Sequence, residues 1–326
     1  MKSNMERLKQ KASKIKSLEI QGATNVALSA IQFLSDYARE FTCSTVDDCL
    51  HKLEKGKELL MATRPTEPAM QNGLNFIMNK IKKCKGELCT EDVPGRIEQY
   101  KDEYEQLIWH SKERIAEIGA RRIPKIKIGD VKKISRQEND FVVMTHCHSS
   151  VVSGILLRAK EEGKTFRVIN TETQPKLQGR KTAKELSEAG IEVIHIVDSA
   201  MRWAVKKYQV DLIIIGADSI TSEGTVLNKI GSRLLALVAH EEHVPFYVAS
   251  PLLKYQPQTT FGILEKIEMR SPSEIWENAP VGINIQNPAF ETVSRRYIDG
   301  LITEAGIFAS SHAHHYFSEL YPDLVE

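Results

Sequence analysis

Apolar residues recur at every third or fourth position through the first 120 or so residues, which is the spacing of one buried face of a helix. The Arg64-Pro65-Thr66-Glu67-Pro68 segment interrupts this pattern, because proline disfavours continuing a helix. The spacing predicts a bundle of helices over residues 5–19, 24–41, from a cap at Ser44 or Thr45 to Met61, 69–83 and 94–120.

From residue 140 the pattern changes to short apolar runs that alternate with helical segments, which is typical of a parallel sheet covered by helices. We therefore predict an α/β protein, with an N-terminal helical domain at residues 1–122 and a Rossmann-like parallel-sheet domain at residues 123–326. A linker is expected near 123–130. Strands are predicted at 140–145, 165–171, 192–197, 211–215, 245–249 and 297–302, and helices at 149–162, 180–189, 199–208 and 229–243.

The composition narrows the class of protein. A formal charge of +1 with 27% charged and 41% hydrophobic residues is typical of a soluble globular chain and gives no reason to expect nucleic acid or a membrane as a partner. The first residues carry no signal-peptide core, so a cytoplasmic location is expected. None of the five cysteines forms a C-x-x-C pair, and disulfides at Cys43/Cys49 or Cys84/Cys89 are not expected in a reducing cytosol.

No Gly-x-Gly-x-x-Gly run follows a predicted strand, and no Walker-type lysine loop is present, so neither a nicotinamide nor a nucleoside triphosphate is indicated. His240-Glu241-Glu242-His243 has the spacing of metal ligands but lacks a third ligand and lies at a charged helix end. A structural or surface role is expected there, and no metal site is predicted.

The segment Thr145-His146-Cys147-His148-Ser149 follows the apolar run 141–144, so Cys147 is expected where a strand ends and a helix begins. Ligands bind at this edge of an open α/β sheet. The helix N-terminus and the two flanking imidazoles predict a lowered pKa for the Cys147 thiol. The alternative is a buried thiol that only fills space at the end of a strand.

Asp218 stands in Gly216-Ala217-Asp218-Ser219, after the apolar run 212–215, and should reach the same sheet edge. Asn228 and Lys229 follow shortly before Gly231, at a predicted helix start, where an amide and an ammonium could contact a phosphate or an oxyanion. A thiol, a carboxylate and an ammonium at one edge would form a proton-transfer site. The alternative for Asp218 is a turn cap.

Several segments together resemble one family. They are Thr171-Glu172-Thr173-Gln174-Pro175-Lys176-Leu177-Gln178-Gly179, Ile196-Val197-Asp198-Ser199-Ala200, Gly216-Ala217-Asp218-Ser219, Asn228-Lys229-Ile230-Gly231 and Asn287-Pro288-Ala289-Phe290. In this order the chain is similar to the superfamily of initiation factor 2B alpha/beta/delta regulatory subunits and sugar-phosphate isomerases. Within it the archaeal ribose-1,5-bisphosphate isomerases show the strongest resemblance, since Cys147 and Asp218 match their catalytic cysteine and aspartate.

The resemblance implies further substrate contacts. These are Gln21, Gly22 and Ala23 in the first helical hairpin, Arg64, Gln178, Asn228, Lys229 and Lys254. Two positions depart from the isomerases, which have arginine where this chain has Gln21 and Gln174. Each change removes a cation that could bind phosphate through two hydrogen bonds. Whether Lys16, Lys176 or Arg180 compensates is a question of three-dimensional structure.

The expected function is the conversion of ribose 1,5-bisphosphate to ribulose 1,5-bisphosphate in AMP metabolism, with Cys147 and Asp218 as proton-transfer groups. No metal or organic cofactor is needed. The resemblance also implies dimers that build a hexamer, and AMP as an activator. Two alternatives stay open: a non-catalytic initiation factor 2B-type regulatory subunit, favoured by Gln21 and Gln174, and a methylthioribose-1-phosphate isomerase, which needs fewer phosphate contacts.

Overall fold

The computed structural model describes residues 3–125, 141–262 and 267–325. Their contacts define two compact units, each drawn from more than one stretch of sequence. Unit 1 comprises Met1–His110, Leu253–Lys266 and His314–Glu326, and unit 2 comprises Ser111–Leu252 and Ile267–Ala313. The division into domains at residues 1–122 and 123–326 stays a prediction, and most of the expected linker lies outside the described residues.

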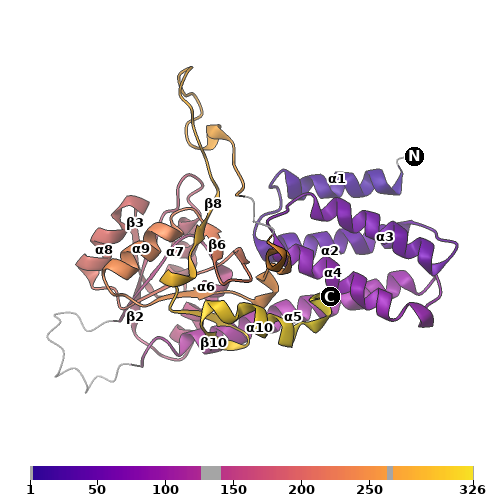
Figure 1. Cartoon of the computed structure of the whole chain (residues 1–326). Coiled ribbons are helices and arrows are strands. Elements are labelled where there is room, and N and C mark those ends of the chain that lie inside the picture. Colours follow the sequence, from indigo (N-terminus) through magenta and orange to yellow (C-terminus); the bar gives the residue numbers. More distant parts are fainter. Residues whose placement is uncertain (1–2, 126–140, 263–266, 326) are drawn as a thin grey trace. The chain divides into compact units, whose positions relative to one another are not determined.

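Unit 1 is built from helices, and the five predicted from the sequence are confirmed (Figure 1). Ser3 begins the first helix with a capping box that includes Glu6, and Thr45, rather than Ser44, accepts the capping hydrogen bond of the third. The helices are α1 (Asn4–Lys16), α2 (Ala23–Glu40), α3 (Val46–Met61), α4 (Pro68–Lys83) and α5 (Val93–Ala120), of which α5 continues into unit 2; α10 (Ala313–Leu320) lies near the C-terminus.

The interior of unit 1 is closely packed around α4. A Cβ atom on Gly73 would lie 2.5 Å from the Ile31 side chain and 2.6 Å from the Tyr104 ring, so only glycine fits there. Tyr104 is fully buried and donates its hydroxyl to the Ala69 carbonyl at 2.7 Å. At the start of α3, Cys43 and Cys49 form a disulfide, with their Cα atoms 5.3 Å apart. The expectation that no disulfide forms was therefore wrong at this pair.

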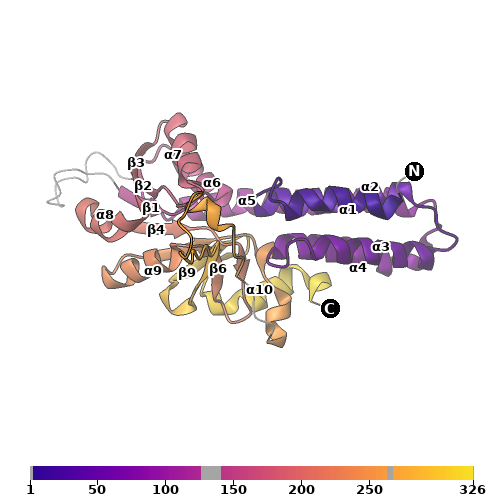
Figure 2. The same ribbon diagram turned by 90° about the horizontal axis from the view of Figure 1, so that it is seen from above.

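Unit 2 contains a seven-stranded sheet in the order β10-β9-β7-β4-β1-β2-β3, and Figure 2 shows β3, β2, β1, β4 and β9 following one another across it. Neighbouring strands are parallel except for β10, which pairs antiparallel with β9. The strands are β1 (Phe141–Thr145), β2 (Phe166–Thr171), β3 (Glu192–Ile196), β4 (Leu212–Ile215), β7 (Phe246–Ala249), β9 (Gly300–Thr303) and β10 (Gly306–Phe308).

The helices that link these strands are α6 (Ser150–Glu161), α7 (Gly179–Glu188), α8 (Met201–Tyr208) and α9 (Ser232–Glu241). A core of aliphatic side chains joins α5, α6 and α7 to one face of the sheet, with fully buried Val143, Ile155 and Ile214 among its members. Burial of such side chains is the main stabilising contribution to the unit. None of the helices in the described ranges is both long and apolar enough to cross a membrane.

A second, antiparallel sheet in unit 2 was not predicted. Its strands are β5 (Ser219–Ile220), β6 (Val226–Lys229) and β8 (Phe290–Val293), in the order β5-β6-β8. The helix predicted at 229–243 therefore begins later, at Ser232, because Asn228 and Lys229 pair with Glu291 and Phe290 of β8. The alternation of strands and helices in the larger sheet is otherwise confirmed.

Candidate functional site

The strand order of the larger sheet reverses between β1 and β4. From β1 the chain continues to β2 and β3 on one side, and β4 then pairs with β1 on its other side. Ligands of open α/β sheets bind at such a reversal, outside the carboxyl ends of the strands. Cys147 follows β1, and Asp218 follows β4. The two residues therefore leave adjacent strands at the edge where a ligand is expected.

Cys147 is held in an unusual backbone conformation. Its φ is +67°, in the left-handed region that non-glycine residues rarely adopt. Thr182 donates its hydroxyl to the Cys147 carbonyl at 3.0 Å and lies 3.0 Å from His148 Nδ1. Because the Thr182 hydroxyl already donates its one proton to the Cys147 carbonyl, its oxygen accepts a hydrogen bond from His148 Nδ1. The thiol is 7% exposed, and its sulfur lies 3.7 Å from Gln178 Oε1.

The two flanking histidines are neutral rather than cationic. His146 Nε2 lies 2.7 Å from the Ile230 carbonyl and so donates to it, while Nδ1 accepts the Thr171 hydroxyl at 2.6 Å. Burial lowers the pKa of His146 and of His148. Neither ring therefore supplies a positive charge to the thiol near neutral pH.

The prediction of a lowered thiol pKa was wrong. Burial raises the pKa of Cys147 to about 11, the Lys229 cation opposes this rise, and the Asp218 carboxylate adds to it. The thiol is thus protonated near neutral pH. The same interactions show that Asp218 and Lys229 both act electrostatically on Cys147, as their predicted positions at one sheet edge require.

We expect single substitutions to move this pKa in opposite directions. Asp218→Asn removes a negative charge that disfavours the thiolate, so the pKa of Cys147 should fall. Lys229→Met removes a positive charge that favours the thiolate, so the pKa should rise. The pH dependence of Cys147 alkylation, followed on its peptide by mass spectrometry, measures both shifts. Glu188→Gln on α7 is a control that should leave the pKa unchanged, and shifts of one sign in both variants would contradict this electrostatic arrangement.

Lys229 is a buried cation on β6. It is 8% exposed, and its ammonium lies 4.5 Å from the centre of the Phe290 ring. Neighbouring Asn228 donates to the Ser232 hydroxyl at 2.8 Å, and that hydroxyl donates to the Lys229 carbonyl at 2.6 Å. The backbone of both residues is therefore fixed by β8 on one side and by the first residue of α9 on the other.

The loop between β2 and α7 is tightly folded beside the thiol. Asp198, just after β3, accepts the amides of Thr173 and Gln174 at 2.9 and 2.7 Å. A Cβ on Gly179 would lie 1.7 Å from the Thr171 carbonyl oxygen, so this position requires glycine. These contacts fix Gln178, the residue whose amide oxygen faces Cys147. No role was predicted for Asp198 from the sequence, although its position directly after a strand could have indicated one.

The remaining predicted contacts belong to unit 1. Gln21 is exposed and donates to the Leu18 carbonyl at 2.8 Å, Gly22 precedes α2 with φ +85°, and Ala23 is buried as its first residue. Arg64 is 8% exposed and pairs with Glu67 at 3.1 Å. These residues lie near the starts of α2 and α4.

Two amide side chains of α4 organise the segments that carry Arg64 and Lys254. Asn72 donates to the carbonyls of Leu253 and Tyr255, both at 2.8 Å. Gln71 donates to the Pro65 carbonyl at 2.6 Å and accepts from Gln256 at 3.1 Å. The neighbours of Arg64 and Lys254 are therefore fixed to the same turn of one helix, which the sequence alone did not indicate.

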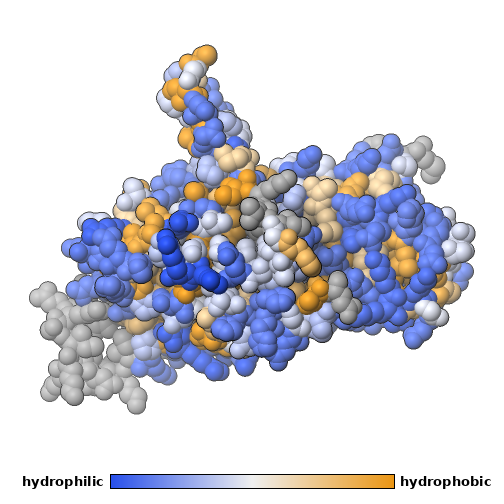
Figure 3. Space-filling model, in the orientation of Figure 1, coloured by the Kyte–Doolittle hydropathy of each residue, from blue (hydrophilic) through white to orange (hydrophobic). Residues whose placement is uncertain are grey.

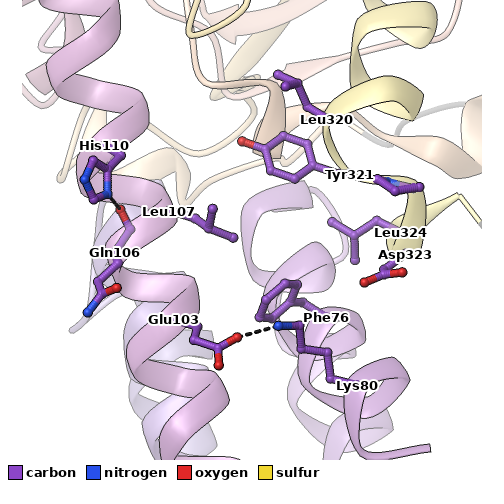
Figure 4. A pocket seen from close by; sticks show the side chains of 11 residues that line it. Phe76, Lys80, Glu103, Gln106, Leu107, His110, Leu320, Tyr321, Asp323 and Leu324 are labelled. Atoms are coloured by element: carbon purple, nitrogen blue, oxygen red, sulfur yellow. Dashed lines mark hydrogen bonds and ion pairs between the residues drawn. The ribbon is translucent and has the colours of Figure 1, made fainter. Parts of the chain in front are cut away.

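Unit 1 also contains a pocket of about 400 Å³ that holds none of the predicted site residues (Figure 4). The Lys80 ammonium pairs with Glu103 there and lies 4.8 Å from the centre of the Phe76 ring. Tyr321 and Leu324 complete an apolar wall. Among the residues that the structure describes, no three His, Cys, Asp or Glu side chains are grouped so that they could hold a metal ion.

Comparison with known proteins places this site in a family. The model of the initiation factor 2 subunit family matches residues 19–310 of the chain. The chain belongs to this family. The match includes most of both units and every segment on which the resemblance in the sequence was based.

Several curated relatives are named ribose 1,5-bisphosphate isomerase. The protein of Methanocaldococcus jannaschii is 35% identical, and the match covers 94% of this chain and 92% of the relative. The protein of Thermococcus kodakarensis is 38% identical, with coverage of 91% and 89%. Among solved structures, the translation initiation factor eIF-2B of Pyrococcus horikoshii is 29% identical with a TM-score of 0.75, over 93% of this chain and 97% of that one. The resemblance to the archaeal ribose-1,5-bisphosphate isomerases is confirmed.

Proposed function

We propose that the chain is an isomerase that converts ribose 1,5-bisphosphate into ribulose 1,5-bisphosphate. The observation that carries the proposal is the pair of Cys147 and Asp218 on adjacent strand ends, with the carboxylate acting electrostatically on a buried thiol. A purely regulatory subunit has no need for such a pair at the ligand-binding edge. The names of relatives that are 35–38% identical over at least 91% of this chain support the choice of substrate.

The reaction requires four proton transfers that balance. The ring oxygen leaves C1 with its bonding electrons and gains a proton, C2 loses its hydrogen as a proton, C1 gains a proton, and the 2-hydroxyl loses one as the C2 carbonyl forms. We assign the two transfers at carbon to Cys147 and the two at oxygen to Asp218. Each group then gains one proton and loses one, so the site returns to its starting state and no external co-reactant is consumed.

The coupling between the two groups suits this cycle. The Cys147 thiol is protonated near neutral pH, and the Asp218 carboxylate raises its pKa, so the thiol ionises more readily once Asp218 holds a proton. That is also the state in which Asp218 can donate to the ring oxygen. Once it has donated, its negative charge favours protonation of Cys147, which then accepts the proton from C2. Lys229 stabilises the negative charge that develops during the steps at carbon.

Residues from both units are proposed to bind the substrate. Gln178, Asn228 and Lys229 are proposed to contact the sugar and a phosphate. The contacts of Gln21, Gly22, Ala23, Arg64 and Lys254 with phosphate are proposed on the same resemblance. Gln174 stands where the isomerases have arginine, and its neutral amide donates to Glu172 at 3.0 Å. Arg180, a candidate substitute for the missing charge, lies 3.9 Å from the same carboxylate. A homo-oligomer, activation by AMP and a cytoplasmic role in AMP metabolism are proposed as well.

The substrate is tested by comparing kcat/KM for ribose 1,5-bisphosphate, methylthioribose 1-phosphate and ribose 5-phosphate, with and without AMP. We expect ribose 1,5-bisphosphate to be preferred by at least about 100-fold, since each charge-assisted contact to the second phosphate contributes about 1.5–3 kcal/mol. A preference for methylthioribose 1-phosphate would instead fit the two missing arginines. No turnover of any of the three would favour the regulatory subunit.

A further inference from the structure

Three cationic side chains from separate segments of unit 2 line one small pocket beside the candidate site. They are Lys176 from the β2–α7 loop, Lys229 from β6 and Arg270 from the segment before β8. Gln178, which faces the Cys147 sulfur at 3.7 Å, lines the same pocket. The other lining residues are Gln174, Pro175, Ile230, Glu274, Asn287, Pro288 and Ala289. Three cations and one carboxylate, Glu274, therefore line this pocket.

Arg270 is the least satisfied of these cations. Its side chain is only 9% exposed, and its Nε atom is buried without a hydrogen-bond partner. Glu274 Oε2 lies 3.5 Å from this nitrogen and Glu268 Oε1 lies 3.8 Å away, which are distances of ion pairs rather than hydrogen bonds. A buried guanidinium donor without an acceptor costs free energy, and an anion that accepts a hydrogen bond from it removes this cost.

Glu274 is the carboxylate that pairs with two of these cations, Lys176 and Arg270. It accepts Lys176 Nζ at 3.0 Å and Asn287 Nδ2 at 3.2 Å. Burial alone would raise the pKa of Glu274, but Lys176, Arg270 and Asn287 together hold it below the usual value, so the carboxylate is ionised near neutral pH. Glu274 thus brings one negative charge to these cations, whereas a bound phosphate group would bring two.

The segment that carries Arg270 is charged at its base and apolar along the rest of its surface. Figure 1 shows residues 267–288 as an orange excursion that leaves unit 2 next to β8, and Figure 3 shows apolar surface along it. Trp276, Val281 and Ile283 are exposed there. Arg270 and Asn287 lie at its base, where the Arg270 amide donates to the Asn287 carbonyl at 2.9 Å. The buried charges are confined to the part that faces Gln178 and Lys229.

We propose that Arg270 and Lys176, together with Lys229, form a binding subsite for a phosphate group of the substrate, and that the phosphate replaces Glu274 as the partner of Arg270 and Lys176. This inference rests on the proposed function for the identity of the phosphate ester. Because Gln178 borders both the subsite and the thiol, the bound phosphate lies beside the reacting carbons. Arg270 and Lys176 thereby supply charge that Gln174 lacks.

The variants Arg270→Gln and Lys176→Gln test the subsite through KM for ribose 1,5-bisphosphate and through competitive inhibition by inorganic phosphate. Loss of a charge-assisted bond corresponds to about a 10- to 100-fold rise in both constants, with kcat changed by no more than about threefold. Glu274→Gln should act in the opposite direction, because removing the competing carboxylate should tighten phosphate inhibition. Arg202→Gln, which removes an exposed arginine paired with Glu241 at 3.0 Å, is the matched control and should change neither constant.

A purely structural role predicts a different result. Arg270→Gln and Glu274→Gln would then both lower the melting temperature while leaving phosphate inhibition unchanged, and this outcome would overturn the subsite. Phosphate binding measured by calorimetry separates the subsite from the proposed reaction. If the wild-type chain binds phosphate and Arg270→Gln weakens that binding, the subsite stands even without turnover. If 50 mM inorganic phosphate does not bind to the wild type, the subsite is wrong.

Discussion

Cys147→Ser and Asp218→Asn should each lower kcat for ribose 1,5-bisphosphate by about 10²- to 10⁴-fold, the range that positioned acid–base groups contribute. A serine hydroxyl is far less acidic than a thiol, so it cannot accept and return the proton at carbon. An asparagine amide cannot carry the proton between the two oxygens. Because both groups act in one coupled cycle, the double variant should lose little more activity than either single variant.

The loss of kcat can be assigned to chemistry only if both variants fold like the wild type. Both substitutions are close to isosteric, so the melting temperature should change by only a few degrees, and KM should change much less than kcat. Glu188→Gln, on the exposed face of α7, serves as the control that keeps full activity. Loss of less than about tenfold in kcat for either variant, in folded protein, would remove that residue from the proton-transfer cycle.

Gly179→Ala should both destabilise unit 2 and reduce activity. The added Cβ would lie 1.7 Å from the Thr171 carbonyl oxygen, so either the end of β2 or the start of α7 must move. Overpacking costs about 1–3 kcal/mol, and we expect the upper end because the obstructing atom belongs to the backbone. Displacing Gln178 by about 1 Å should lower kcat/KM by about 100-fold.

Gly154→Ala is the matched control in the same unit. Gly154 lies within α6, and its added Cβ would meet only the Ala116 side chain at 3.8 Å, an ordinary contact. Alanine is favoured over glycine inside a helix, so this variant should gain up to about 1 kcal/mol and keep its activity. Chemical denaturation and steady-state kinetics measure both variants. A Gly179→Ala protein as stable and active as the wild type would show that the loop does not need this close approach.

Local patterns were sufficient to predict most of the fold. The apolar spacing in α1 to α5 and the runs that became β1, β2 and β4 are decided within short windows of sequence. The small sheet was missed because β6 pairs with β8, which lies far along the chain, and with β5, which is only two residues long. Lys229 accordingly lies in a strand and not at the start of a helix.

The candidate site was predictable in its residues and not in its electrostatics. Cys147 and Asp218 follow recognisable strands, so their meeting at one edge follows from topology. Burial raises the pKa of the thiol, the Lys229 cation opposes this rise, and the buried His146 adds no positive charge. A local sequence pattern reveals none of these three effects. Nothing in the sequence indicated a role for Arg270, because only the folded chain brings this residue close to Lys176 and Lys229.

The central claim is tested most directly by incubating the purified chain with ribose 1,5-bisphosphate and following the phosphorus NMR signals of substrate and product, with Cys147→Ser in parallel. We expect the wild type to convert the substrate to ribulose 1,5-bisphosphate until equilibrium is reached, while the variant produces almost none in the same time. An unchanged substrate spectrum with the folded wild-type protein, both with and without AMP, would show that the chain is not this isomerase.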